Sequence, residues 1–203
     1  MSSDALPVHH PPRERRNVDS LLIVNTGDGK GKSTAAFGTL MRSVARGWPV
    51  CVVQFMKSGQ WRVGEAEVAR RLGVTWLTHG DGFTWESDDL DRSAGIAREA
   101  WRIASQVLAS GEYRLVILDE VTYPMNYGWV DTAAVIEALR SRFATTNVIC
   151  TGRNAPAELV DLADTVTEMR NVKHAYQTGV RARRGIDFCR SVRVGPGPPC
   201  PGN

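Results

Sequence analysis

The residue types best suited to chemistry cluster in a glycine- and lysine-rich run, TGDGKGKST, at residues 26–34. An apolar run at residues 21–24 precedes it, and a segment with helical spacing starts at Lys32. In a strand–loop–helix arrangement, glycines let successive backbone N–H groups point at phosphate oxygens, and the helix N-terminus adds a partial positive charge. The run is therefore a P-loop that predicts a nucleotide site, with Lys32 as a mobile charge for the phosphates and Ser33 as a hydroxyl ligand for magnesium.

The P-loop departs from the strict pattern GxxxxGK[ST] at one position. That pattern requires glycine at position 26, where this chain has Thr26. The pattern is shifted rather than absent, because the glycines that follow still give the backbone its freedom. The predicted phosphate-binding residues are Gly27, Asp28, Gly29, Lys30, Gly31, Lys32, Ser33 and Thr34.

Two carboxylates, Asp119 and Glu120, follow another apolar run at residues 115–118. A carboxylate at the end of a buried strand holds magnesium opposite a P-loop, so Ser33, Asp119 and Glu120 are the predicted metal ligands. These motifs define a class and not a reaction. An ATP-driven motor, in which Glu120 would polarise water, a kinase and an adenosyl transferase all stay open, whereas the lack of an NKxD-like motif disfavours a GTPase.

The elements that must position these residues alternate along the chain. Apolar runs predict buried strands at residues 21–24, 50–55, 74–78, 115–118, 148–150 and 165–169. Helical spacing is found at residues 32–46, 65–72, 93–108 and 157–162, and in the face formed by Val135, Ile136, Leu139 and Phe143. Unbroken apolar strands separated by helices predict a three-layer αβα fold, P-loop NTPase-like, with a mostly parallel sheet covered on both faces. Ligands of such sheets bind beyond the carboxyl ends of the strands.

Length and composition agree with one domain. The chain has 203 residues, 42% of them hydrophobic and 23% charged, which excludes global disorder. Residues 1–19 predict a flexible arm, residues 20–190 the folded domain, and residues 191–203 a disordered tail rich in proline and glycine. A net charge of +3 does not indicate nucleic acid as a partner, and no apolar stretch approaches the ~20 residues of a membrane span.

The cysteines and the N-terminus predict a cytoplasmic protein. The chain has 4 cysteines and no CxxC pair, which argues against a disulfide framework or a zinc ribbon. The first residues contain no apolar segment of the kind that a signal peptide requires. Reduced thiols in the cytoplasm are the simplest interpretation.

Several spaced motifs in one order carry a family resemblance. After the P-loop come VQFMK at residues 53–57, GFTWE at 82–86, LDEVTY at 118–123 and TGR at 151–153. DLAD at residues 161–164 and VKHAY at 172–176 follow, and then GV at 179–180 and GID at 185–187. In this order, over about residues 20–188, the chain closely resembles the P-loop type of ATP:corrinoid adenosyltransferase.

The resemblance implies a reaction. Enzymes of this family move the 5′-deoxyadenosyl group of ATP to the Co(I) of a reduced corrinoid, triphosphate leaves, and ATP lies reversed in the loop. The substrates would be ATP and a corrinoid, with Mg²⁺ as cofactor, a flavin-dependent or flavodoxin-type reductant as partner, and a homodimer as the assembly. The N-terminal segment can close over the corrinoid site.

The resemblance also implies residue roles. By resemblance, Arg153 would contact the nucleotide, and Phe83 and Trp85 would pack at the corrinoid and favour loss of its lower axial ligand. Lys32 and Glu120 would be catalytic for a chemical reason, because the departing triphosphate needs its charge neutralised by Lys32 and by a magnesium ion held by Glu120 or Asp119. Lys173 and His174 match the family without an assigned role. The chain differs from many relatives by Asp28, where they have Asn, and by Ser33 in place of Thr.

Two other hypotheses remain open at this point. A P-loop ATPase coupled to a macromolecular partner would hydrolyse ATP without a corrinoid. A non-catalytic carrier would bind corrinoid or nucleotide without turnover.

Overall fold

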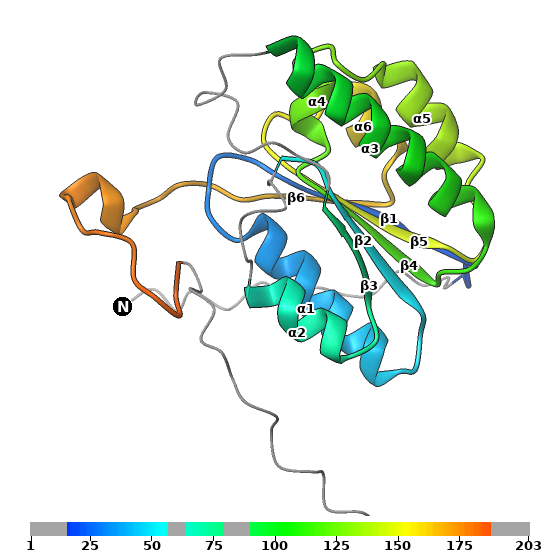
Figure 1. Cartoon of the computed structure of the whole chain (residues 1–203), viewed down its shortest axis with the longest axis horizontal. Coiled ribbons are helices and arrows are strands. Elements are labelled where there is room, and N and C mark those ends of the chain that lie inside the picture. Colours follow the sequence, from blue (N-terminus) through cyan, green and yellow to red (C-terminus); the bar gives the residue numbers. More distant parts are fainter. Residues whose placement is uncertain (1–15, 57–63, 79–89, 188–203) are drawn as a thin grey trace, which may run out of the picture.

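The sheet is the frame of the domain. The computed structural model describes residues 16–56, 64–78 and 90–187 (Figure 1). The strands stand in the order β3-β2-β4-β5-β1-β6, and every neighbouring pair is parallel. Their bounds are β1 Leu22–Thr26, β2 Val50–Gln54, β3 Thr75–Thr78, β4 Leu115–Asp119, β5 Asn147–Thr151 and β6 Thr165–Glu168. All the predicted strands are confirmed, and the sheet is entirely parallel among the described residues.

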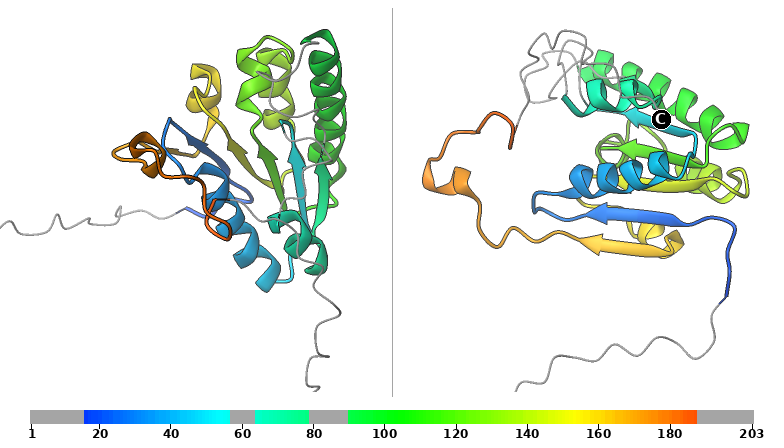
Figure 2. Two further views of the ribbon diagram at one scale, coloured as in Figure 1. Left: turned by 60° about the vertical axis from the view of Figure 1, so that its left-hand side comes forward. Right: turned by 90° about the horizontal axis from the view of Figure 1, so that it is seen from below.

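Helices cover both faces of this sheet. Helices α1 (Lys32–Ala45) and α2 (Gly64–Arg71) lie on one face, and α3 (Leu90–Ser110), α4 (Thr122–Asn126), α5 (Thr132–Arg140) and α6 (Ala157–Leu162) on the other (Figures 1 and 2). The predicted three-layer fold is therefore confirmed. None of these helices, in the part of the chain that the structure describes, has the length and apolar character needed to cross a bilayer.

The central strands bury side chains on both faces, as the unbroken apolar runs predict. In β4, Leu115 and Ile117 pack into the core beneath α1 and α2, whereas Val116 and Leu118 pack into the core beneath α3 and α5. All four are essentially inaccessible to solvent. Because successive side chains of a strand point to opposite faces, only a sheet covered on both sides can bury such a run.

Three details differ from the sequence expectations. Phe143 does not belong to the apolar face of α5, because the helix ends at Arg140 and Phe143 lies in the following turn, 47% exposed. Strand β6 is exposed at all four residues, so the coverage of both faces does not extend to this edge. Helix α4 and the 3₁₀ helix η2 (Ala175–Thr178) were not predicted, because such short helices have too few turns to show periodicity.

The strand order decides where the functional segments meet. Strands β4, β5 and β1 are neighbours, and they run in the same direction. The segments that follow them therefore emerge together at the carboxyl ends of the strands, where α/β folds bind ligands. The predicted arm and tail lie largely or wholly outside the described residues, and those boundaries stay predictions.

Candidate active site

The loop between β1 and α1 is shaped by backbone contacts to the segment after β6. Gly27 has φ +92, and a Cβ at this position would lie 2.5 Å from the carbonyl oxygen of Met169. The N–H of Gly29 donates to that same oxygen at 2.6 Å. Gly31, with φ +121, is the N-cap of α1. Position 27 therefore requires glycine, because both the positive φ and the lack of space exclude a side chain.

Thr26, where the strict pattern requires glycine, has a structural role of its own. Its hydroxyl oxygen accepts from the backbone N–H of Ala155 at 3.1 Å, which joins the end of β1 to the loop after β5. Its carbonyl accepts from the N–H of Met169 at 2.9 Å. The left-handed turn is made one residue later, at Gly27, so the shifted pattern still builds the loop.

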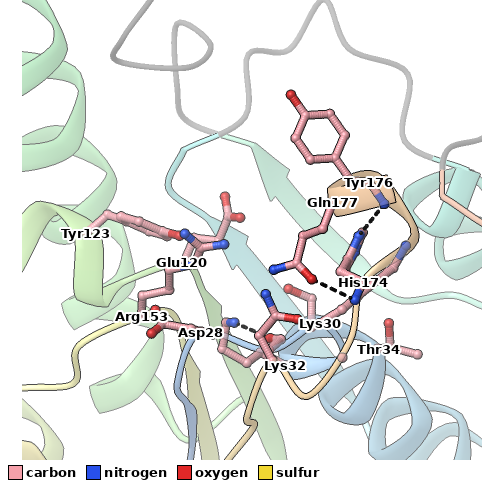
Figure 3. Close-up of a pocket in the computed structure, with 14 residues that line it drawn as sticks. Asp28, Lys30, Lys32, Thr34, Glu120, Tyr123, Arg153, His174, Tyr176 and Gln177 are labelled. Atoms are coloured by element: carbon pink, nitrogen blue, oxygen red, sulfur yellow. Dashed lines mark hydrogen bonds between the residues drawn. The ribbon is translucent and has the colours of Figure 1, made fainter. Parts of the chain in front are cut away.

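A cavity of about 520 Å³ opens over this loop. Figure 3 shows Glu120, Tyr123 and Arg153 on one side of it and His174, Tyr176 and Gln177 on the other, with the loop between them. Its wall consists of Asp28, Gly29, Lys30, Gly31, Lys32, Ser33, Thr34, Glu120, Tyr123, Arg153, Asn171, His174, Tyr176 and Gln177. The structure thus brings Arg153 and Glu120 to the loop, as expected, whereas Gly27 and Asp119 do not line the cavity.

Lys32 is held by the carbonyls of its own loop. Its Nζ donates to the carbonyl oxygens of Gly27 and Gly29, each at 2.7 Å. Burial lowers the pKa of Lys32, and the charge of Arg153 lowers it further, while Asp28 and Glu120 act in the opposite direction. An ammonium group has three protons, so one of them remains for a further acceptor such as a phosphate oxygen.

The two predicted carboxylates have different surroundings. Asp119 is 0% exposed, and its oxygens accept from Thr151 Oγ1 and Gln54 Nε2, each at 2.8 Å. Glu120 lines the cavity and has φ +65, a conformation that is rare for a residue with a Cβ. Backbone strain of this kind is common at functional sites, and here it turns the chain so that Glu120 can line the cavity.

The cavity offers oxygen ligands that suit magnesium. The Ser33 hydroxyl and the Glu120 carboxylate line the same cavity, and hard oxygen donors are what Mg²⁺ prefers. Among the described residues, no group of three or more His, Cys, Asp or Glu side chains could hold a metal by itself. This donor set fits an ion that takes one or two protein ligands and completes its shell with phosphate and water.

Arg153 is positioned by its backbone. Its carbonyl oxygen accepts from Thr122 Oγ1 at 2.7 Å and from Asn126 Nδ2 at 3.1 Å, and both donors belong to α4. Gly152, just before it, has φ +144, and a Cβ there would lie 2.0 Å from Thr122 Oγ1. The short helix that the sequence did not predict therefore holds the loop that presents Arg153.

Comparison with known proteins identifies the chain. A family model described as ATP:corrinoid adenosyltransferase BtuR/CobO/CobP matches residues 19–188. This chain belongs to that family. A corrinoid adenosyltransferase of Escherichia coli strain K12 is 43% identical over 83% of this chain and 85% of its own length. A corrinoid adenosyltransferase of Sinorhizobium sp is 41% identical over 83% of this chain and 80% of its own length.

A solved structure supports the fold. The flagellar accessory protein FlaH from Methanocaldococcus jannaschii superposes with a TM-score of 0.52 over 74% of this chain and 71% of its own, at 11% identity. At this identity the likeness concerns the fold alone.

Sequence reasoning missed much of one wall of the cavity of this adenosyltransferase. Four residues of the segment after β6 line it: Asn171, His174, Tyr176 and Gln177. His174 Nδ1 accepts from the N–H of Tyr176 at 3.1 Å, so the imidazole caps η2 and has a structural partner. This segment lies at the same end of the sheet as the loop after β1 (Figure 2). The VKHAY motif was the available signal, but the motif does not say which surface it faces.

One ion pair joins the phosphate loop to the end of the described segment after β6. Lys30 forms an ion pair with Asp187, so the segment after β6 is attached to the phosphate loop a second time. The hydrogen bond from the N–H of Arg183 and the contact with Lys30 lower the pKa of Asp187. Phe83 and Trp85, the residues expected at the corrinoid, lie outside the described residues.

Proposed function

We propose that this protein transfers the 5′-deoxyadenosyl group of ATP to the Co(I) of a reduced corrinoid in the cavity over residues 28–34, and releases triphosphate. The observation that carries the proposal is the meeting of Lys32, Arg153 and Glu120 around the phosphate loop of a chain that belongs to this family. The reaction is a step in making adenosylcobalamin.

The chemistry requires charge neutralisation more than proton transfer. Co(I) supplies the electron pair that forms the cobalt–carbon bond, and the bond between C5′ and the triphosphate oxygen breaks with its electrons on the leaving group. No general base is needed. The loop amides, the N-terminus of α1, Lys32 and Arg153 surround the place where the negative charge grows, and preorganised donors of this kind are typically the largest contribution to catalysis.

Magnesium would be held by Ser33 and Glu120. When bound there with ATP, the ion would neutralise part of the phosphate charge. Glu120 is the better of the two predicted carboxylates for this role, because Asp119 is enclosed and both its oxygens already accept hydrogen bonds. Lys30 would exchange its ion pair with Asp187 for a phosphate oxygen.

The corrinoid side of the site rests on the family resemblance. Phe83 and Trp85 would pack against the ring system, where an apolar wall disfavours a polar lower ligand and leaves the cobalt easier to reduce. We expect a flavin-dependent or flavodoxin-type reductant, a homodimer and a cytoplasmic location.

The decisive experiment combines the protein with ATP, Mg²⁺ and a chemically reduced corrinoid. We expect the absorption spectrum of Co(I) to give way to that of the adenosylcorrinoid, with triphosphate as the inorganic product in equal amount. ADP and phosphate formed without an adenosylcorrinoid would contradict the proposal and favour an ATPase. Binding of both substrates without any product would favour a carrier.

Two sets of variants locate the reaction. Lys32→Ala should lower the transfer rate by ~10²–10³-fold, whereas Arg46→Ala, exposed at the other end of α1, should not change it. Phe83→Ala and Trp85→Ala should impair the reaction that starts from Co(II) corrinoid and a reductase, and should leave ATP binding unchanged. Parent-like behaviour of these two variants would show that the aromatic assignment is wrong.

A further inference from the structure

A buried chain of hydrogen bonds runs under the active site, across the ends of three neighbouring strands. It consists of Gln54 at the end of β2, Asp119 at the end of β4 and Thr151 at the end of β5, each 0% exposed. Gln54 Nε2 donates to Asp119 Oδ2 at 2.8 Å, and Thr151 Oγ1 donates to Asp119 Oδ1 at 2.8 Å. Thr151 Oγ1 in turn accepts from the backbone N–H of Glu120 at 2.9 Å.

Each bond in this chain has one direction. A threonine hydroxyl has a single proton, and because the Glu120 N–H can only donate, the hydroxyl of Thr151 must give its proton to Asp119. The carboxylate of Asp119 accepts, so Gln54 must turn its NH₂ group toward it. Gln54 Oε1 then faces away, and it has no hydrogen-bond partner among the described residues. Turning the amide over would place Oε1 against Asp119 Oδ2, and two acceptors cannot form a hydrogen bond.

The hydrogen-bond chain ends at Glu120, which is the one non-glycine residue with a positive φ among the described residues that line the cavity. Glu120 has φ +65, and a residue with a Cβ keeps such a conformation only where its surroundings hold it. The N–H of Glu120 donates to Thr151 Oγ1, and the carbonyl oxygen of Glu120 accepts from the N–H of Tyr123 at 3.3 Å. With both peptide groups bound, the direction in which the Glu120 side chain leaves the backbone is set.

We propose that Asp119, through Thr151, is a positioning residue that fixes the backbone of Glu120 so that its carboxylate enters the cavity, and that Asp119 is not itself a metal ligand. Gln54 holds the second oxygen of Asp119 and so prevents the carboxylate from turning away from Thr151. The inference rests on the proposed function only where it assigns Glu120 to the cation. The hydrogen-bond chain itself is tested without turnover.

A pair of valine variants separates positioning from stability. Thr151→Val removes the hydroxyl that links Asp119 to Glu120 in the hydrogen-bond chain, and Thr151→Ser retains it. The matched control is Thr146→Val, since Thr146 is also 0% exposed, donates to the Tyr113 carbonyl at 2.8 Å and precedes the same strand at its opposite end. Both valine variants delete a buried hydroxyl that donates a hydrogen bond, so both should lower the melting temperature. Thr151→Val should lower it more, because it also removes the acceptor of the Glu120 N–H.

Three quantities are measured on the full-length parent and on each variant. They are hydrogen exchange of the Glu120 amide by NMR, binding of Mn²⁺ in the presence of ATP by electron paramagnetic resonance, and kcat for transfer. Thr151→Val should weaken Mn²⁺ binding or lower kcat by ~10–100-fold, as loss of a group that orients a metal ligand typically does. It should also accelerate exchange of the Glu120 amide. Thr151→Ser and Thr146→Val should stay within ~3-fold of the parent in all three.

Two results would overturn the inference. One is a Thr151→Val protein that matches Thr146→Val in exchange, Mn²⁺ binding and kcat. The other, which needs no variant to fold, is a Glu120 amide in the parent that exchanges as fast as an unprotected one. If the parent makes no adenosylcorrinoid, the proposed function fails, while amide exchange and Mn²⁺ binding still decide the role of Asp119.

Discussion

Gly152 is the position where one added methyl group should disturb the site most. An alanine Cβ would lie 2.0 Å from Thr122 Oγ1 and 3.1 Å from its Cβ, at a φ of +144. Thr122 is 0% exposed and its hydroxyl donates to the Arg153 carbonyl, so it has no open space to move into. The clash is therefore relieved only by moving α4 or the loop that carries Arg153.

The magnitude follows from two contributions. A side chain at a positive φ costs ~1–3 kcal/mol, and overpacking of a full interior costs a similar ~1–3 kcal/mol. Gly152→Ala should thus lower the free energy of unfolding by ~2–6 kcal/mol. For a domain of this size that corresponds to a fall in melting temperature of ~5–20 °C.

The assay is thermal and urea unfolding followed by circular dichroism. Gly38→Ala is the control, because Gly38 lies inside α1 and a Cβ added there would meet nothing within 4 Å, so alanine should stabilise by ~0.5–1 kcal/mol. Combining Gly152→Ala with Thr122→Ala should cost less than the sum of the two single variants, by ~1–3 kcal/mol. A melting temperature for Gly152→Ala equal to that of the parent, or strict additivity in the double variant, would refute the reasoning.

Three further predictions concern other parts of the domain. Burial raises the pKa of Cys51 and of Cys150 to about 12, so both thiols should resist alkylation at pH 8 until the protein unfolds. An unfolded thiol loses its proton near pH 9, whereas the folded protein keeps both protons up to about pH 12. The contribution of these two groups to the free energy of unfolding is therefore complete below pH 9 and should fall as the pH rises toward 12. Urea midpoints measured across this pH range will check it. Asp187→Asn should release Lys30 and make the segment after β6 more sensitive to limited proteolysis. The pKa of Asp187 is lowered, so the parent should gain the same sensitivity only as the pH falls far enough to protonate this carboxylate. Thr26→Gly restores the strict P-loop pattern but should lower the free energy of unfolding by ~1–2 kcal/mol in urea titrations, because the N–H of Ala155 loses the acceptor it has at 3.1 Å. An equal or higher stability would contradict the role given to Thr26.

Much of the phosphate loop could be predicted without a structure. A strand, a loop rich in glycine and lysine, and a helix are consecutive in the chain, so their meeting requires no long-range information. The choice between Asp119 and Glu120 could not be made in this way. Adjacent residues in a strand point to opposite sides, and which side faces the cavity depends on the left-handed turn at Glu120 and on its bond to Thr151.

The contribution of the chain's last described segment was also out of reach. His174 and Gln177 are far from the loop in sequence, and nothing in their local pattern indicates which surface they contact. Phe143 shows the opposite error, since its spacing suits the face of α5 although the helix has already ended at Arg140. Periodicity reports compatibility with a helix and not the position of its last turn.

The amino-acid sequence by itself determined the kinds of elements and their chemistry: strands apolar on both sides that demand a parallel sheet, and a glycine-rich bend suited to phosphate. Only the tertiary structure decided that β4, β5 and β1 are neighbours, and that Glu120 and Arg153 therefore face the same loop. The reason is physical. Local patterns follow from backbone geometry and burial within one element, whereas the meeting of side chains from distant segments depends on strand order, register and hydrogen bonds that no single segment contains.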